Sequence, residues 1–343
     1  MTVEKLFKAR KIFMLASATI LIFILPFSLS VGSYNVTYLD TLKFILGYSN
    51  LPPDATSILL IRLRRALAGI LIGFILGASG TAMQSVLRNP MASPFTLGIS
   101  SAAALGVAVV LLTGLEGSVR GVILAYSNPY IIPIFALVFA LIQTAIVLLL
   151  AYRAGLSERA LVLAAIAMNF FYQALLSLIQ YLKLNELQVA LIVFWSFGDV
   201  GRIGWVELKI IAIAASALSI YFIDRALDFD LMGLGDDVAY ASGVNAKRVR
   251  LEASIVAAIG ASIVTAFSGV IAFLCLISPH IARLVVGNNH RYLIPESMIV
   301  AAILLIAADS IGRFILSPIT LPVGVTLSLI GSPLLIYLLL KRR

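Results

Sequence analysis

The chain alternates between long runs of apolar residues that carry no charge and shorter polar connections. A helix needs about 20 apolar residues to cross the hydrocarbon core of a bilayer. Runs of this kind occupy residues 12–39, 66–87, 89–115, 121–152, 160–182, 253–282 and 314–340. Two further spans are expected at 205–223 and 292–311, where the charged residues lie near the ends. The pattern predicts an all-α, polytopic membrane protein.

The run at 253–282 is long enough to contain more than one helix. Gly269 and the pair Ser278-Pro279 interrupt it, and both features favour a helix break. We expect one full span and a shorter returning helix here, which brings the total to about ten transmembrane helices. An even number of spans places both termini on the same side of the membrane.

Composition agrees with this interpretation. Of 343 residues, 61% are apolar and 12% are charged, and the mean hydropathy is +1.07, whereas a soluble domain is about a quarter charged. No segment is polar enough to cover a soluble domain, so residues 1–343 are expected to form one transmembrane domain. One cysteine excludes an internal disulfide, and one Cys with two His cannot supply the four ligands of a usual zinc site. We therefore expect no metal site and no cofactor.

The net charge of +9 is distributed between the apolar runs and is not gathered on one soluble face. This distribution argues against a nucleic-acid partner and is typical of a chain whose partner is membrane lipid. Basic residues near both ends of the chain place both termini in the cytoplasm by the positive-inside rule. The main exception is the group Arg62, Arg64 and Arg65, which this topology puts at the outer end of the second span.

The segment 225–250 is the one long polar connection expected on the cytoplasmic side. Asp236 and Asp237 favour the N-terminus of a short helix, because acidic residues there complement the helix dipole. Gly243, Val244 and Asn245 then offer a helix stop followed by a new start. Two short helices joined by this turn would form a knob that fits a cleft on a partner protein. The alternative is a solvated loop that only connects two spans.

The sequence contains no Gly-Lys pair and hence no Walker A loop for ATP phosphates. The chain is therefore not expected to be an enzyme, and any ATP that drives it would be hydrolysed by another subunit. Glu296 and Asp309 are the carboxylates of the later spans, and both fall near predicted helix ends, where they serve more often in capping or in hydrogen bonds between helices. An ion-gradient-driven secondary transporter, which needs an intramembrane carboxylate, remains the alternative.

Seven segments give the chain a resemblance to a known family. In Arg62-Leu63-Arg64-Arg65-Ala66-Leu67-Ala68-Gly69 the third residue is Arg where the family usually has Pro. The other segments are 77–84, 89–98, 194–198, 234–245, 269–283 with Ser278-Pro279-His280, and 321–333. In their order and spacing the chain resembles the FecCD-type permeases of ABC importers for iron-siderophores, haem and cobalamin, over nearly its whole length.

The resemblance implies a homodimer of ten-span subunits of the type II ABC importer fold, similar to the cobalamin importer permease. It also implies two copies of a separate ABC ATPase inside and a substrate-binding protein outside. The knob at 225–250 would then be the coupling-helix segment seated in the ATPase. Its expected contact residues are Gly235, Asp236, Asp237, Ala239, Gly243 and Val244.

The same resemblance gives the exceptional arginines a role. It implies that Arg62, Arg65 and Arg313 face outward and pair with glutamates of the binding protein. Ion pairs of this kind steer docking and fix its register more than they add affinity. The alternative is that these side chains extend to lipid headgroups.

A cytoplasmic gate is implied just before the fifth span. The small hydroxyl residues of the cobalamin importer are replaced here by a charged stretch, so Ser157, Glu158 and Arg159 are the candidate gate residues. The resulting hypothesis is a multi-pass permease of the cytoplasmic membrane that imports a metal chelate (iron-siderophore, haem or cobalamin). The choice of chelate would belong mainly to the binding protein.

Overall fold

The computed structural model describes residues 3–48, 51–115, 119–120, 123–124 and 128–341. The α-helices are α1 (Val3–Ser30), α2 (Tyr38–Ile45), α3 (Pro53–Val86), α4 (Ile99–Thr113), α5 (Ile131–Arg153), α6 (Glu158–Lys183), α7 (Glu186–Ser196), α8 (Trp205–Asp224), α9 (Ala226–Leu234), α10 (Asp236–Ala241), α11 (Ala246–Ser268), α12 (Leu274–Val286), α13 (His290–Ile315) and α14 (Val323–Lys341). Two short 3₁₀ helices, η1 (Pro94–Leu97) and η2 (Val200–Arg202), and one antiparallel pair of two-residue strands, β1 (Val119–Arg120) and β2 (Ile123–Leu124), complete the described elements.

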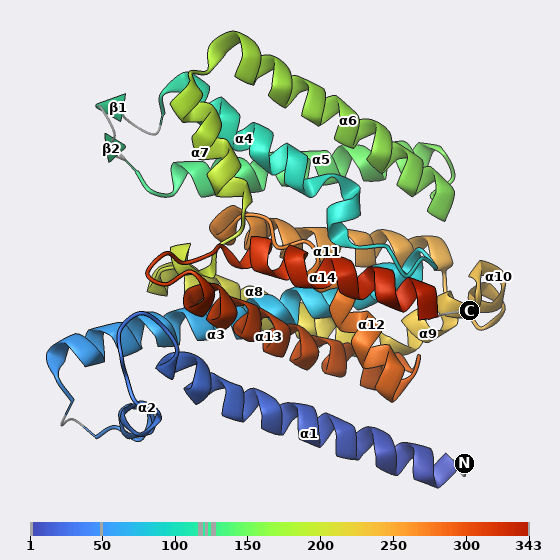
Figure 1. Ribbon diagram of the computed structural model, residues 1–343. Helices are drawn as coiled ribbons and strands as arrows, with labels where there is room; N and C mark the ends of the chain where they lie inside the picture. The colour runs from blue at the N-terminus through green and yellow to red at the C-terminus, as the bar shows by residue number, and fades with distance from the viewer. Residues whose placement is uncertain (1–2, 49–50, 116–118, 121–122, 125–127, 342–343) are drawn as a thin grey trace.

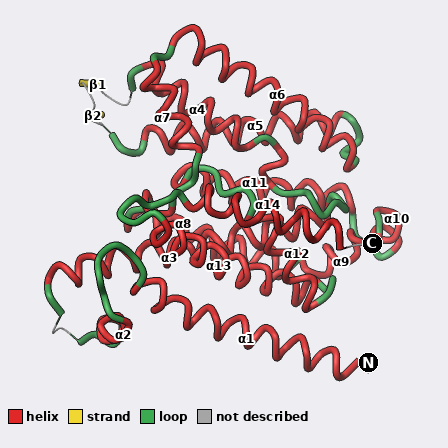
Figure 2. The backbone as a smooth tube through the Cα atoms, in the orientation of Figure 1, coloured by secondary structure: helices red, strands yellow, loops and turns green. Residues whose placement is uncertain are grey.

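The helices form a bundle whose connections lie at its two ends (Figure 2). In the described ranges, seven helices are long and apolar enough to cross a membrane: α3, α5, α6, α8, α11, α13 and α1 from Arg10 onward. The other three expected spans correspond to the shorter helices α4, α12 and α14. The prediction of an all-helical, polytopic membrane protein is confirmed.

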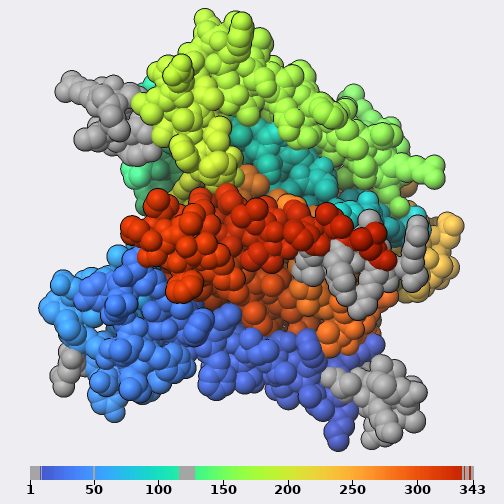
Figure 3. Space-filling model, in the orientation of Figure 1, coloured from blue at the N-terminus to red at the C-terminus, as the bar shows by residue number. Residues whose placement is uncertain are grey.

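Helix α3 lies at the centre of the bundle and packs against α13, α12 and α11. Small residues on one face of α3 allow the backbones to approach closely. A Cβ on Gly73 would lie 2.5 Å from the Cα of Ala302 in α13, and one on Gly80 would overlap the carbonyl oxygen of Cys275 in α12. Helix α6 lies at the periphery (Figure 1), and α14 crosses the middle of the face seen in Figure 3, between α1 and α6.

The two ends of the bundle carry different elements (Figure 1). Both ends of the chain, the pair α9–α10 and the connection from α5 to α6 lie at one end, which we call the α10 end. Helix α2 and the two short strands lie at the other, the α2 end. The two termini therefore lie at the same end of the bundle, and the side of the membrane that this end faces stays a prediction.

Several predicted boundaries are wrong. The second span begins at Pro53, not at residue 66, because Pro suits the first position of a helix and because Arg62 and Arg65 inside it find hydrogen-bond partners. The third begins at Ile99 because Gly98, with φ of +83°, ends the preceding turn. The fourth begins at Ile131 and the last at Val323, both later than expected.

The predicted break at Gly269 is confirmed, since α11 ends at Ser268 and Gly269 has φ of +77°. The break at Ser278-Pro279 is wrong, because α12 continues through Pro279. Pro279 lacks the N–H that would pair with the carbonyl oxygen of Cys275, and Nε2 of Gln84 in α3 donates to that oxygen at 3.4 Å. Helices α2 and α7 were not predicted.

Candidate functional site

The polar segment 225–250 folds into α9, α10 and the start of α11. Gly235, with φ of +123°, joins α9 to α10, and Gly243, with φ of +85°, forms the turn after α10. Asn245 caps α11 by accepting a hydrogen bond from the Arg248 amide. A short helix starting at Asp236 and a Gly243 turn are therefore found as expected. The second helix, however, is not a short separate one but the start of the 23-residue α11.

The candidate coupling residues differ in exposure. Asp237 and Gly243 are exposed, and Asp236 and Val244 are half-buried. Ala239 is fully buried and faces the core of the protein, so its side chain is not on the outer face of α10. Tyr240, which is 80% exposed, and Val238 lie on that outer face and were missed by sequence reasoning. The sequence signal for these two residues is that an apolar and an aromatic side chain stand on either side of Ala239.

Arg250 of α11 connects the coupling segment to the rest of the α10 end. Its side chain is 1% exposed, yet its guanidinium donates 2.6 Å to Oδ1 of Asp236 and 3.4 Å to Oε1 of Glu158. It also donates to the carbonyl oxygens of Val86 and Leu156. A buried guanidinium needs such partners, because an unpaired charge in the interior is very costly.

Arg88 completes this group by pairing with Glu158. We call Arg88, Glu158, Asp236 and Arg250 the Arg250 cluster. Hydrogen bonding and the positive charge of Arg250 lower the pKa of Asp236, against the effect of its partial burial. The hydrogen bond that Arg88 donates to Glu158 raises the pKa of Arg88. The cluster joins α10 to the start of α6.

The candidate gate residues lie at this junction. Glu158 is the first residue of α6 and belongs to the Arg250 cluster. Ser157 caps α6 by accepting a hydrogen bond from the amide of Ala160, and Arg159 is exposed. The structure thus brings one predicted gate residue and one predicted coupling residue onto the same guanidinium, which sequence reasoning did not foresee.

A second group of charges lies at the α2 end. Arg65 of α3 donates to Oδ1 of Asp309 at 2.6 Å and to Oδ1 of Asp199 at 3.0 Å. Arg313, one turn after Asp309 on α13, donates to Oδ2 of Asp309 at 3.0 Å. We call Arg65, Asp199, Asp309 and Arg313 the Arg65 cluster. It joins α3, α13 and the turn before η2.

The three arginines expected to dock a binding protein are turned inward. Arg62 and Arg313 are each 6% exposed. Arg62 donates to the carbonyl oxygens of Leu29 and Tyr34, and Arg313 donates to those of Ser28 and Val31. The expectation that they face outward is therefore wrong in this structure, because the chain itself supplies their partners. Their docking role stays a prediction.

Asp309 acts as the hydrogen-bond partner between helices that its sequence position suggested, although it lies inside α13 and not at its end. Glu296, also within α13, is fully buried. In the described ranges no group of three or more His, Cys, Asp or Glu side chains is placed to hold a metal ion.

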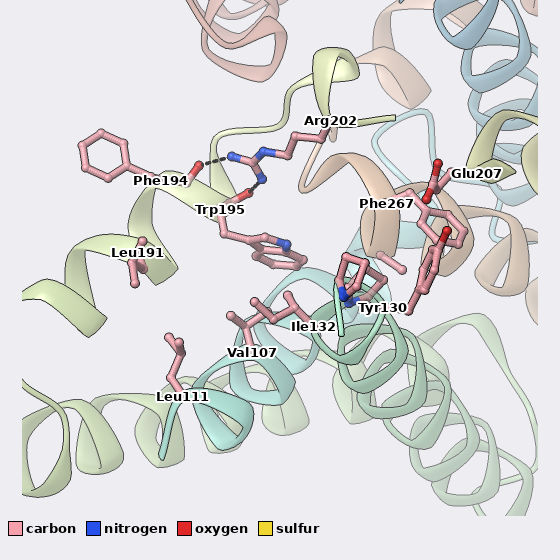
Figure 4. A pocket seen from close by; sticks show the side chains of 13 residues that line it. Val107, Leu111, Tyr130, Ile132, Leu191, Phe194, Trp195, Arg202, Glu207 and Phe267 are labelled. Carbon is pink, nitrogen blue, oxygen red and sulfur yellow. Dashed lines mark hydrogen bonds between the residues drawn. The ribbon is translucent and has the colours of Figure 1, made fainter. Parts of the chain in front are cut away.

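Two cavities open at opposite ends of the bundle. The one at the α2 end has a volume of about 470 Å³ and is lined by aromatic side chains that include Tyr130, Trp195 and Phe267 (Figure 4). On its rim Arg202 donates to the carbonyl oxygens of Phe194 and Trp195, which end helix α7. This arrangement satisfies carbonyls that the helix leaves unpaired. The cavity at the α10 end lies beside α9 and has a polar lining.

Comparison with known proteins identifies the class. A solved ABC transporter described as of the metal-chelate type, in an inward-facing conformation, superposes with a TM-score of 0.81 at 25% identity, and the match covers 97% of this chain and 99% of that one. The fold is that of an ABC importer permease. The sequence matches the FecCD transport family over residues 20–341, and the chain belongs to this family. The predicted resemblance is confirmed.

Two relatives illustrate the family. A protein of Methanocaldococcus jannaschii named as an ABC transporter permease is 40% identical over 318 residues, which cover 92% of this chain and 90% of the relative. The hemin transport system permease of Yersinia pestis is 33% identical over 82% of this chain and 83% of the relative. These matches favour the importer permease over the ion-gradient-driven alternative.

Proposed function

We propose that this chain is the membrane subunit of an importer for an iron chelate, driven by a separate ABC ATPase. The Arg250 cluster carries this proposal, because it joins the exposed α10 to the start of α6 through one buried guanidinium. A force applied to α10 by an ATPase is thereby passed to a membrane-spanning helix. An iron chelate is chosen because relatives are named as permeases for Fe³⁺-citrate, Fe³⁺-hydroxamate and hemin.

The α10 end faces the cytoplasm in this proposal, and both termini with it. Two copies of the chain form the pathway between them, and each copy binds one ATPase through Asp236, Asp237, Gly243 and Val244. Gly235 is buried and forms the turn from which α10 starts. The exposed side chains of Val238 and Tyr240 extend this contact surface. Ser157, Glu158 and Arg159 close the pathway on the cytoplasmic side.

The α2 end faces the substrate-binding protein. Since Arg62 and Arg313 bind the carbonyls of residues 28–34, they shape the surface on which the binding protein docks. Arg65 does the same for the turn at Asp199. Direct pairing with glutamates of the binding protein would require these side chains to exchange their internal partners.

The test is ATP hydrolysis by the reconstituted permease and its partner ATPase, with and without substrate-loaded binding protein. Gly243→Trp is expected to abolish the response to the binding protein, because Trp would obstruct the turn after α10. Gly47→Trp is the matched control for ATPase binding and basal hydrolysis: Gly47 also has a positive φ (+80°) and open space around it, but it follows α2 at the end of the bundle away from the ATPase. Equal ATPase binding and equal basal hydrolysis in the two variants would contradict the coupling role. The absence of any ATPase binding would contradict the proposed function itself.

A further inference from the structure

The cavity beside α9 has features that the coupling role of α10 does not explain. Its volume is about 550 Å³, and its lining includes Gln84, Arg88, Asp230, Arg283 and His290. Gln84 and His290 are buried and form its floor, whereas Arg88 is exposed at its rim. The cavity thus has a polar floor and an open mouth at the α10 end.

His290 on the floor has one nitrogen in use and one without a partner. Oδ1 of Asp230 lies 2.6 Å from Nδ1 of His290 and also accepts the His290 backbone N–H. Nε2 is buried and has no hydrogen-bond partner among the described residues. The side chain is 8% exposed. A buried polar atom without a partner costs free energy. When the imidazole carries a proton on both nitrogens, Nε2 can donate to a carboxylate that enters the cavity.

The charge of the lining favours an anion. Arg88 and Arg283 contribute two guanidinium groups against one carboxylate of the described lining, Asp230, and Arg88 also pairs with Glu158 outside the lining. Arg283 donates to Oε1 of Gln84 at 3.0 Å, which holds its side chain toward the floor. Guanidinium groups bind carboxylates with charge-assisted hydrogen bonds. An acidic side chain therefore suits the cavity better than a basic or an apolar one.

The position of the cavity indicates which molecule brings that acid. Gly233 and Leu234 form part of the lining, and the coupling residue Gly235 follows them directly. Leu234 is 68% exposed. A protein that binds α10 would therefore also cover the mouth of this cavity, because the two surfaces are continuous.

We propose that the cavity is a second docking point for the partner ATPase, which inserts an Asp or Glu side chain between Arg88 and Arg283 toward His290. The proposal rests on the proposed function and deepens it, because a second contact fixes the rotation of the ATPase about α10. A carboxylate pair of this kind is partly removed from water, and removing one of its charges weakens binding severalfold.

The first test measures the dissociation constant of the ATPase for the full-length permease in nanodiscs. Arg283→Gln is expected to weaken binding by about fivefold or more. Arg291→Gln is the control, since it removes the same charge from an exposed position eight residues further on, outside the cavity lining, and is expected to change binding less than about twofold. Equal constants for the two variants would overturn the proposal.

A second test does not depend on the loss of an interaction. Arg283→Lys places a primary amine in the cavity, and a water-soluble carbodiimide joins an amine to a nearby carboxylate as an amide with loss of water. Mass spectrometry of the cross-linked complex is expected to find position 283 joined to an Asp or Glu of the ATPase, and Arg291→Lys to give no such product. A complex that forms, responds to Gly243→Trp and yields no cross-link at 283 would overturn the docking point and leave the proposed function standing.

Discussion

Nη2 of Arg250 lies 2.6 Å from Oδ1 of Asp236, and this ion pair links α10 to helix α11 of the membrane-spanning bundle. Asp236 is the first residue of α10, where a carboxylate also complements the helix dipole. Arg250 lies in the second turn of α11. The pair therefore fixes the base of the exposed α10 to a long helix of the bundle.

Arg250→Met is expected to separate ATP hydrolysis from transport. Met fills the space of the aliphatic part of the Arg250 side chain. It cannot make the hydrogen bonds of the guanidinium to Asp236, to Glu158 and to the backbone carbonyls at 86 and 156. We expect the ATPase to bind the variant and hydrolyse ATP at a basal rate without stimulation by the binding protein. Chelate uptake into proteoliposomes, measured beside ATP hydrolysis, checks this. Arg248→Met, at an exposed position of the same helix, is the control and should retain coupling.

The stability of the α10 end should depend on pH only in acid. Because Arg250 holds the pKa of Asp236 below its usual 3.8, the folded state favours the carboxylate, and the pair contributes stability above the unfolded pKa. That contribution is lost as the pH falls through the lowered value, below about pH 4. Thermal unfolding in detergent between pH 3 and 7 measures it. Asp236→Asn should flatten this acid dependence, and Asp237→Asn should not.

Asp309→Asn should destabilise the protein strongly. The carboxylate of Asp309 is shared by Arg65 and Arg313, and all three side chains are largely buried. Removing one charge from a buried network leaves the others uncompensated, at a cost of about 3–5 kcal/mol. Denaturant unfolding of the purified permease measures the difference. Asp54→Asn, at an exposed position in the first turn of α3, is expected to change stability by less than about 0.5 kcal/mol; comparable losses in both variants would refute the role of the Arg65 cluster.

Two glycines on the same face of α3 should respond differently to alanine. At Gly73 the added Cβ would lie 2.5 Å from backbone atoms of Ala302, which cannot move alone, so Gly73→Ala is expected to cost about 1–3 kcal/mol through overpacking. At Gly69 the nearest atom is Cγ1 of the Ile306 side chain at 3.3 Å, which can rotate away. Gly69→Ala should therefore be nearly neutral. The thermal stability of both variants in the same detergent decides the point.

The sequence predicts most of the spans because the apolar runs reflect the thickness of the bilayer, which is a local requirement. It places the start of α3 wrongly because three arginines seemed to end the apolar run. Arg65 is tolerated inside the helix because it pairs with Asp199 and Asp309, 134 and 244 residues further along the chain. Arg62 is tolerated because it donates to the carbonyl oxygens of Leu29 and Tyr34. Such distant partners leave no mark in the local pattern.

In the candidate site, too, the locally determined features could be predicted and those that depend on distant residues could not. Asp236, Gly243 and Glu158 could be proposed from local polarity and from the family resemblance. Arg250 could not be proposed from the sequence, since its partners at Val86 and Glu158 are 164 and 92 residues away. The inward turn of Arg62 and Arg313 could not be read either, because carbonyl oxygens at 28–34 accept their hydrogen bonds.

The glycine face of α3 also constrains how the subunit can change shape. Where Gly73 and Gly80 meet α13 and α12, backbone touches backbone and no layer of side chains remains between them to repack. Sliding of α3 past α12 or α13 by a fraction of an ångström would make backbone atoms clash, so α3, α12 and α13 move as one rigid unit. Any rearrangement during a transport cycle must then tilt this unit as a whole. The Arg65 cluster lies at one end of the unit, and the Arg250 cluster, which the ATPase would move through α10, lies at the other.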